Sequence, residues 1–254
     1  MWMMGLYLAQ YGAGFWASTP ARFVVSAAVT VAFALLGHIV RGVSNSGAIA
    51  GGMVCLILLS CVGPGAFLVL FSLFMVTWIA TRLGRARKQT LGTAERREGR
   101  TAAQVLANLS VAAVCGFLYA LRAELAWLIA MVAALAEVAT DTVASECGQA
   151  LSQEAWLITT FQRVPAGTDG GISIAGTGFG IGAGFLIALV GFGCGLVPAR
   201  WLWVPAVAGF LGMLADSVLG AWLERGGWLN NEQVNLAGTV IGAVMGVVSV
   251  RMIT

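Results

Sequence analysis

The sequence predicts an all-α protein, a polytopic transmembrane bundle of seven or eight helices forming a single integral membrane domain over residues 1–254. Three observations predict this class. Of the 254 residues, 59% are hydrophobic and only 10% are charged, whereas roughly 25% of the residues of a soluble domain carry charge. The apolar residues form runs long enough to cross about 30 Å of hydrocarbon. Charges, prolines or glycines bound these runs. The high hydrophobic and low charged fractions exclude a soluble globular enzyme and a disordered chain.

The first four expected helices lie on either side of a basic segment. Arg41 ends the first apolar run, and the turn Gly63-Pro64-Gly65 divides the second run from the third. Residues 82–100 then carry seven of the fourteen lysines and arginines before the fourth run begins. These runs cover residues 21–40, 47–62, 65–80 and 101–121. Residues 1–17 have no basic region before their apolar stretches, so we expect a short membrane or interfacial segment there instead of a cleaved signal.

The last four expected helices are separated by polar connections. Arg122 and Glu124 divide the fourth run from the fifth, and a glycine-rich connection over residues 148–175 precedes the sixth. Pro198 ends the sixth run, and a charged connection over residues 224–232 precedes the eighth. These runs cover residues 124–145, 176–197, 201–222 and 234–252. Several of the eight runs are short, so the expected number of spans is seven or eight.

The distribution of charge predicts the orientation. Because cytoplasmic loops of membrane proteins are enriched in lysine and arginine, the basic segment 82–100 is expected in the cytoplasm. Alternation of the spans then places the connections 148–175 and 224–232 on the same side. Ten of the eleven acidic residues lie on this face or in the helix halves that lead to it. We therefore expect a multi-pass protein of a bacterial-type inner membrane whose active face is cytoplasmic.

Other residue counts exclude several functions. A net charge of +3 is too small to indicate nucleic-acid binding. The five cysteines show no C-x-x-C spacing, and His38 is the one histidine of the chain, so no conventional zinc site or Ser-His-Asp triad can be assembled. Hydrolytic acyl transfer is therefore disfavoured.

An acidic motif ends the fifth expected helix. Glu137, Asp141 and Ser145 follow one another at i, i+4 spacing and so share one helical face. A carboxylate at membrane depth is costly unless it faces a polar cavity or a cation, and two acids one turn apart can share Mg²⁺ with the phosphates of a substrate. Glu146 points roughly the opposite way on an ideal helix. An interhelical hydrogen-bonding cluster and a proton or ion relay are the alternatives.

A glycine-rich motif precedes the sixth expected helix. Glycine allows backbone N–H groups to close around an anion, and the following helix N-terminus favours negative charge. The motif lacks the Gly-Lys-Ser/Thr of a Walker A sequence, and a simple turn into a glycine-packed helix is the alternative. Asp169 adds a negative charge within it. The residues expected to contact a polyphosphate here are Gly167, Thr168, Gly170, Gly171, Ser173 and Thr177.

Two further polar groups lie on the same predicted face. Asp216 lies inside its span, where an unpaired carboxylate would be costly, and Asn231 and Asn235 begin the last helix. We expect these amides either to bind polar groups of a substrate or to pack helices together.

The basic segment is expected either to bind phosphates or only to orient the protein at the lipid headgroups. Its candidate residues, with the helix that follows, are Lys88, Arg97, Arg100 and Asn108.

Four ordered motifs together resemble a known family. They are R-E-G-R-T-A-A-Q-V-L-A-N from Arg97, E-V-A-T-D-T-V-A-S-E-C-G from Glu137, P-A-G-T-D-G-G-I-S-I-A-G-T from Pro165, and A-D-S-V-L-G-A followed by L-N-N-E-Q-V-N between Ala215 and Asn235. This combination resembles the integral membrane family called domain of unknown function ninety-two, which includes plant and cyanobacterial phytyl-phosphate kinases. The resemblance implies phosphorylation of an isoprenoid monophosphate to the diphosphate, with Mg²⁺ and with CTP or another nucleoside triphosphate.

The resulting hypothesis is a membrane kinase whose partners are an isoprenoid phosphate and a nucleotide, with no nucleic acid; an oligomer is compatible with it. The expected metal ligands are Glu137, Asp141, Glu146 and Asp216. The first two and Asp216 are also the expected catalytic acids, and Arg100, with Arg97 and Lys88, is expected to neutralise the charge that develops. The alternatives are a carrier or flippase for an anionic lipid or small phosphate compound, coupled through the buried acids, and a CTP-dependent lipid cytidylyltransferase.

Overall fold

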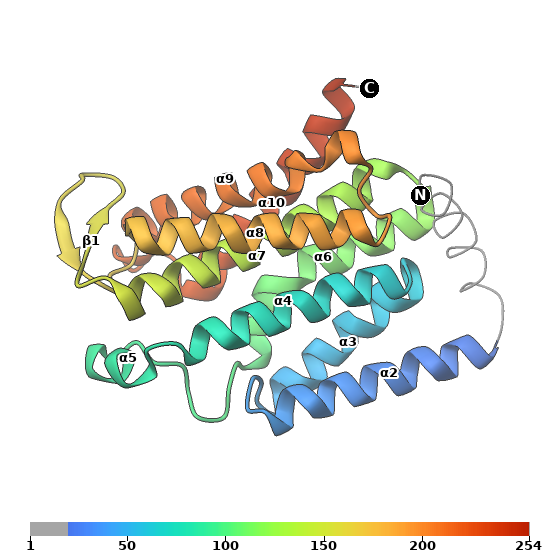
Figure 1. Cartoon of the computed structure of the whole chain (residues 1–254), viewed down its shortest axis with the longest axis horizontal. Coiled ribbons are helices and arrows are strands. Elements are labelled where there is room, and N and C mark those ends of the chain that lie inside the picture. Colours follow the sequence, from blue (N-terminus) through green and yellow to red (C-terminus); the bar gives the residue numbers. More distant parts are fainter. Residues whose placement is uncertain (1–19, 254) are drawn as a thin grey trace.

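A computed structural model describes residues 20–253 of the chain (Figure 1). The expected N-terminal segment over residues 1–17 lies outside the described residues. The helices run mostly along the long axis of the molecule, and the short helix α5 and a small β-sheet lie at one end of the bundle (Figure 1). The helices are α2 (Pro20–Ile39), α3 (Asn45–Cys61), α4 (Pro64–Arg82), α5 (Arg85–Leu91), α6 (Ala102–Arg122), α7 (Leu125–Leu151), α8 (Ile174–Gly193), α9 (Trp203–Leu219) and α10 (Asn231–Ile253).

The helices confirm the predicted polytopic helical membrane fold. Within the described part of the chain, six helical segments are long and apolar enough to cross a membrane, and α2 and α3 are shorter apolar helices. Together they match the seven or eight spans expected. The span that contains α9 is lengthened by a 3₁₀ turn at Ala199–Trp201 and by a π-helical turn at Gly220–Glu224.

Polar residues cap the helices where the apolar runs begin. Thr101 accepts a hydrogen bond from the backbone N–H of Gln104, whose side chain accepts one from the backbone N–H of Thr101, a capping box that starts α6. Ser44 starts α3 and Ser173 starts α8 in the same way, each accepting from the backbone N–H three residues on. Local sequence therefore determines these helix starts.

The connection 148–175 differs from the glycine-rich loop that we expected. Helix α7 continues to Leu151, and the chain then forms a three-stranded antiparallel sheet in the order β2-β1-β3. The strands are β1 (Glu154–Leu157), β2 (Arg163–Pro165) and β3 (Gly171–Ile172). Strands of two to four residues are too short for a period-two pattern to stand out in the sequence.

Helix α7 forms the centre of the bundle. It packs against α4, α6, α8, α9 and α10, and nearly all of its first nineteen residues are buried. Alanines occupy many of these positions, which lets the neighbouring backbones approach closely.

Glycines on three neighbouring helices face α7. A Cβ placed on any of them would lie within 3.2 Å of an atom of α7. At six of them the distance is below 3.0 Å, which real Cβ atoms essentially never show, and at Gly191, Gly242 and Gly246 it is 3.0–3.2 Å, so that the neighbour would have to move. Several recur at four-residue spacing, the small-xxx-small pattern of closely packed membrane helices. They are Gly176, Gly180, Gly184 and Gly191 on α8, Gly209 and Gly212 on α9, and Gly238, Gly242 and Gly246 on α10.

Two glycines of α8 test this packing. A Cβ at Gly180 would lie 2.5 Å from the carbonyl oxygen of Thr140, whereas a Cβ at Gly182 would meet nothing within 4 Å. We expect Gly180→Ala to lower the free energy of unfolding by about 1–3 kcal/mol. Gly182→Ala should leave it unchanged or raise it by up to about 1 kcal/mol. Equilibrium unfolding in mixed detergent micelles measures both, and equal stabilities would contradict the packing described.

Candidate functional site

A polar hollow lies where α7, α8, α9 and α10 meet the connection after α7, and we call it the acidic pocket. It contains about 1020 Å³ of empty space, including its open mouth. Segments far apart in the sequence form its wall, and most of the predicted site residues lie in it. These are Asp141, Gly167, Thr168, Gly170, Gly171, Ser173, Thr177, Asp216, Asn231 and Asn235.

The charge of the acidic pocket is entirely negative among the residues that line it. Four carboxylates, those of Asp141, Asp169, Asp216 and Glu224, belong to its wall, and no lysine or arginine of residues 20–253 does. Asp141 and Asp216 interact with each other electrostatically, as do Glu224 and Asp169. An anion can therefore bind here only together with cations that screen these carboxylates.

Glu137 lies beneath the pocket, one helical turn deeper than Asp141. Its side chain is only 1% exposed, and glycines of α9 and α10 pack directly against it. A Cβ at Gly212 would lie 2.5 Å from Cγ of Glu137, and a Cβ at Gly238 would lie 2.6 Å from its Oε1 and 3.4 Å from Oδ2 of Asp216. The absence of side chains at Gly212 and Gly238 thus leaves the space in which Glu137 and Asp216 lie close together.

Two carboxylate oxygens of this group have no hydrogen-bond partner within residues 20–253. They are the buried Oε1 of Glu137 and Oδ2 of Asp216. A buried carboxylate oxygen without a partner is strongly destabilising, and at membrane depth it indicates a cation or a polar ligand. These two unpaired oxygens are therefore the observation that indicates ligand binding at this site.

The carboxylates fit Mg²⁺ shared with a phosphate better than a metal site made by the protein alone. No group of three histidine, cysteine, aspartate or glutamate side chains in the described residues is arranged to hold a metal ion. Mg²⁺ is usually held by one or two carboxylates, with substrate phosphates and water completing its coordination. Asp141 and Asp216, which both line the pocket, can supply those carboxylates.

The glycine-rich segment forms the part of the pocket wall that packs against the C-terminal end of α9. Gly167 and Gly170 have φ of +91° and +73°, a conformation that favours glycine. A Cβ at Gly170 would lie 2.5 Å from Ala221 and 2.6 Å from the Ser217 carbonyl, so the segment lies directly on the end of α9. The π-helical turn Gly220–Glu224 is located at this contact, as such turns often are at functional sites.

Some backbone amides of this segment already have partners. The N–H groups of Thr168 and Gly171 donate to carbonyls within the segment, and that of Gly176 donates to Oγ of Ser173. The hydroxyl of Thr168 likewise donates to the carbonyl of Pro165. A phosphate here would therefore meet the remaining amides, the hydroxyl of Thr177 and the N-terminus of α8, not a full ring of N–H groups.

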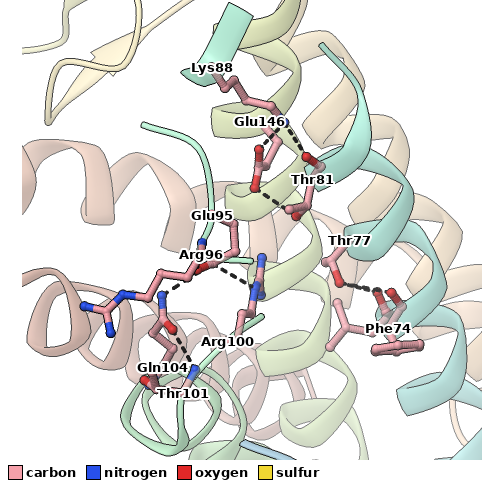
Figure 2. A network of polar contacts seen from close by, with 11 residues as sticks. Phe74, Thr77, Thr81, Lys88, Glu95, Arg96, Arg100, Thr101, Gln104 and Glu146 are labelled. Carbon is pink, nitrogen blue, oxygen red and sulfur yellow. Dashed lines mark hydrogen bonds and ion pairs between the residues drawn. The ribbon is translucent and has the colours of Figure 1, made fainter. Parts of the chain in front are cut away.

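The basic segment is arranged differently from our expectation. The ammonium group of Lys88 is buried, 1% exposed, and lies 2.5 Å from Oε2 of Glu146. It also donates to the carbonyls of Ala80 and Thr81, while Oγ1 of Thr81 donates to Oε1 of Glu146 (Figure 2). Lys88 thus binds the C-terminal end of α4 to α7, where a cation is favoured by the helix dipole.

Several predicted residues lie outside the acidic pocket. Neither Lys88, Glu146 nor Arg97 lines it, and Arg97 is exposed. Arg100 and Asn108 line a different pocket on the other side of α7, although Arg100 interacts electrostatically with Asp141. The phosphate and metal roles expected for Lys88, Arg97 and Glu146 stay predictions, and the proposal below does not use them.

The pocket also contains residues that the sequence analysis did not single out. Thr93, Gln149 and Glu224 line it, and Nε2 of Gln149 donates to Oγ of Ser145. Gln149 continues the i, i+4 series of Glu137, Asp141 and Ser145 by one turn. Recognising that α7 extends past residue 145 would have identified it.

Comparison with known proteins gives a family match and several relatives. The family described as integral membrane protein DUF92 matches residues 28–243. Membrane protein sll0875 of Synechocystis is 35% identical over 75% of this chain and 76% of its own length. Membrane protein MJ0933 of Methanocaldococcus jannaschii is 34% identical over 89% and 93%. The chloroplastic protein VTE6 of Arabidopsis thaliana is 30% identical over 85% and 67%. No solved structure matches the chain.

The ion pair between Lys88 and Glu146 can be tested against an exposed pair. Lys88→Met leaves a largely buried carboxylate without its cation, so we expect the free energy of unfolding to fall by about 3 kcal/mol. Arg163→Met breaks the exposed pair with Glu154 and should cost less than about 1 kcal/mol. Equilibrium unfolding in detergent micelles gives both values. Equal losses would contradict a structural role for Lys88, and a stable Lys88→Met that lost nucleotide binding would favour a phosphate contact.

Proposed function

Because the chain belongs to the DUF92 family of integral membrane proteins, we propose that it is a membrane-embedded kinase of prenyl-phosphate metabolism. It transfers a phosphoryl group from a nucleoside triphosphate, with CTP favoured, to an isoprenoid monophosphate and forms the diphosphate. The resemblance to phytyl-phosphate kinases supports the substrate class, and the acidic pocket supports the reaction type. Its active face is the cytoplasmic one, where the basic segment lies.

The unpaired carboxylate oxygens of the acidic pocket carry this proposal. Asp141 and Asp216 face a glycine-rich segment and the N-terminus of α8 across one hollow. A polyphosphate is the anion that this combination suits, because it brings Mg²⁺ with it and the carboxylates require a cation. Bound Mg²⁺ supplies charge neutralisation of the phosphates. A simple structural cluster of hydrogen bonds would instead leave Glu137 and Asp216 with satisfied oxygens.

The protein's own residues divide into three roles. Asp141 and Asp216 would hold Mg²⁺, and Glu137 lies beneath them. The glycine-rich segment and Asn231 and Asn235 hold the nucleotide at the mouth of the pocket. Arg100, whose guanidinium interacts with Asp141, stabilises negative charge that develops during transfer.

The reaction needs no strong base. An ionised oxygen of the isoprenoid monophosphate forms a bond to the γ-phosphorus, and the bond from that phosphorus to the bridging oxygen of the nucleotide breaks. The products are the isoprenoid diphosphate and the nucleoside diphosphate. Since the attacking oxygen already carries negative charge, positioning and electrostatic stabilisation are sufficient. The presence of a single histidine in the chain is therefore compatible with this reaction.

The activity can be assayed directly. Purified full-length protein, phytyl or geranylgeranyl monophosphate, Mg²⁺ and each radiolabelled nucleoside triphosphate should yield the lipid diphosphate with at least one donor. Asp141→Asn and Asp216→Asn should lower the rate by about 100-fold or more, the scale for removing one electrostatic contact to a transition state. Glu154→Gln, at an exposed position of β1, is the matched control and should be unaffected.

Other products would identify the alternatives. Release of pyrophosphate with formation of a CDP-lipid would show a cytidylyltransferase. Nucleotide-independent movement of lipid phosphate across proteoliposomes, abolished by Asp141→Asn, would show a carrier. Absence of diphosphate with every donor would overturn the kinase proposal.

Nucleotide binding gives a second and independent measurement. At a nucleotide concentration about 100-fold above its Kd, binding should stabilise the folded protein by about 2.7 kcal/mol. We expect this increase in Tm to require Mg²⁺, because all the charged side chains among the described residues that line the pocket are carboxylates, and to be reduced in Asp141→Asn and Asp216→Asn. Stabilisation of equal size with EDTA present would contradict the assignment of these carboxylates.

A further inference from the structure

A second pocket lies on the other side of α7, and we call it the arginine-rimmed pocket. It opens between α2, α3, α4 and α6 and contains about 1030 Å³ of empty space, including its open mouth. Most of its wall is apolar. The main apolar side chains are those of Phe33, Leu70, Leu73, Phe74, Val105 and Leu109.

Packing does not close this pocket. On the α3 wall, a Cβ at Gly51 would meet Val105 alone among the described residues, at 3.9 Å, which is an ordinary van der Waals distance. The glycines that face α7 leave no such room. The ring of Phe33 packs edge-on against Phe67 and Phe74, with centroids 5.6 and 5.5 Å apart, so aromatic side chains support one side of the hollow. An apolar hollow between membrane helices is suited to an apolar chain.

One end of the pocket is strongly basic. Five arginines line it against a single carboxylate, that of Glu95, which lies 3.9 Å from Arg100. The guanidinium of Arg82 lies over the ring of Trp78, 4.2 Å from its centroid, and donates to the carbonyl of Val40. The arginines are Arg41, Arg82, Arg85, Arg96 and Arg100. This excess of cations at the end of an apolar hollow indicates an anionic group on an apolar chain.

Backbone contacts hold Arg100 at this rim. Its N–H donates to the carbonyl of Gly42, and its carbonyl accepts from the N–H of Ser44. Figure 2 shows its side chain between Glu95 and Thr77. Arg100 is therefore placed by the turn between α2 and α3 as well as by its own segment.

The two pockets meet at α7. Val138 lines the arginine-rimmed pocket and Asp141 lines the acidic pocket. Residues three apart on a helix are neighbours on its surface, and Arg100 of the first pocket interacts with Asp141 of the second. A group held at the arginine rim would therefore lie beside the carboxylates of the acidic pocket.

We propose that the arginine-rimmed pocket is the acceptor site and holds a phosphate monoester of one long apolar chain. The chain lies among α2, α3, α4 and α6, and the phosphate lies at the arginines with Arg100 between it and Asp141. This assignment rests on the proposed kinase function and deepens it, because it gives donor and acceptor separate pockets of opposite charge. A nucleotide fits this pocket less well, since its sugar and base would face a wall that is mostly apolar.

Binding without nucleotide tests the assignment independently of catalysis. Full-length protein in a zwitterionic detergent is titrated with radiolabelled geranylgeranyl monophosphate in the absence of nucleotide and Mg²⁺. Gly51→Phe should weaken binding by about tenfold or more by filling the pocket, whereas Gly51→Ala should bind as the unaltered protein does. Gly182→Phe is the matched control, because it places the same ring on the open face of α8.

A charge variant keeps the test decisive if Gly51→Phe fails to fold. Arg85→Gln combined with Arg96→Gln should weaken binding of geranylgeranyl monophosphate but not of geranylgeraniol, which lacks the phosphate. Inorganic phosphate should compete poorly, because it lacks the chain. The assignment is overturned if Gly51→Phe binds the monophosphate normally, if the arginine variant does, or if the unaltered protein does not bind it.

The two proposals can fail separately. Loss of lipid-phosphate binding in Gly51→Phe together with no diphosphate product under any condition would support the pocket and overturn the kinase. Diphosphate formation by the unaltered protein together with normal binding by Gly51→Phe would support the kinase and overturn the pocket.

Discussion

Close packing of glycine and alanine faces around α7 is the constraint on which the rest of the structure depends. Because membrane helices gain little from burying apolar surface against one another, small residues that allow backbones to approach supply much of their packing energy. Here the glycines of α8, α9 and α10 bring three backbones onto α7. The same contacts enclose Glu137 so tightly that its Oε1 and Oδ2 of Asp216 are left without partners in the described residues.

This packing buries charged side chains, which costs free energy. The contacts that offset this cost differ from one charged group to another. The Lys88–Glu146 pair is satisfied by neighbouring carbonyls and by Thr81, so it stabilises the junction of α4 and α7. Oε1 of Glu137 and Oδ2 of Asp216 have no such partner among residues 20–253. Buried charges that are paired within the protein are typically structural, whereas unpaired ones in a cavity are candidates for ligand binding. The contrast separates two acids, Glu146 and Asp216, that the sequence alone treated alike.

The two pockets beside α7 carry opposite charge: the acidic pocket is negative and the arginine-rimmed pocket is positive. Among the described residues, no lysine or arginine lines the acidic pocket, whereas five arginines and one glutamate line the arginine-rimmed pocket. Arg100 connects them because the turn between α2 and α3 holds its backbone. In the proposed phosphoryl transfer, a water-soluble anion and a lipid anion must approach each other although they repel each other. Separate pockets that share one helix would reduce this repulsion.

The sequence by itself determined the spans, the starts of α3, α6 and α8, and most of the residues that line the acidic pocket. Hydrophobic runs, caps and i, i+4 spacing are local, so they can be read without neighbours. Only the tertiary structure decided that Lys88 pairs with Glu146, that Arg100 and Asn108 belong to a second pocket, and that residues 154–172 form a sheet. Each of these depends on which helices become neighbours. That choice is made by shape complementarity around α7, which no local pattern encodes.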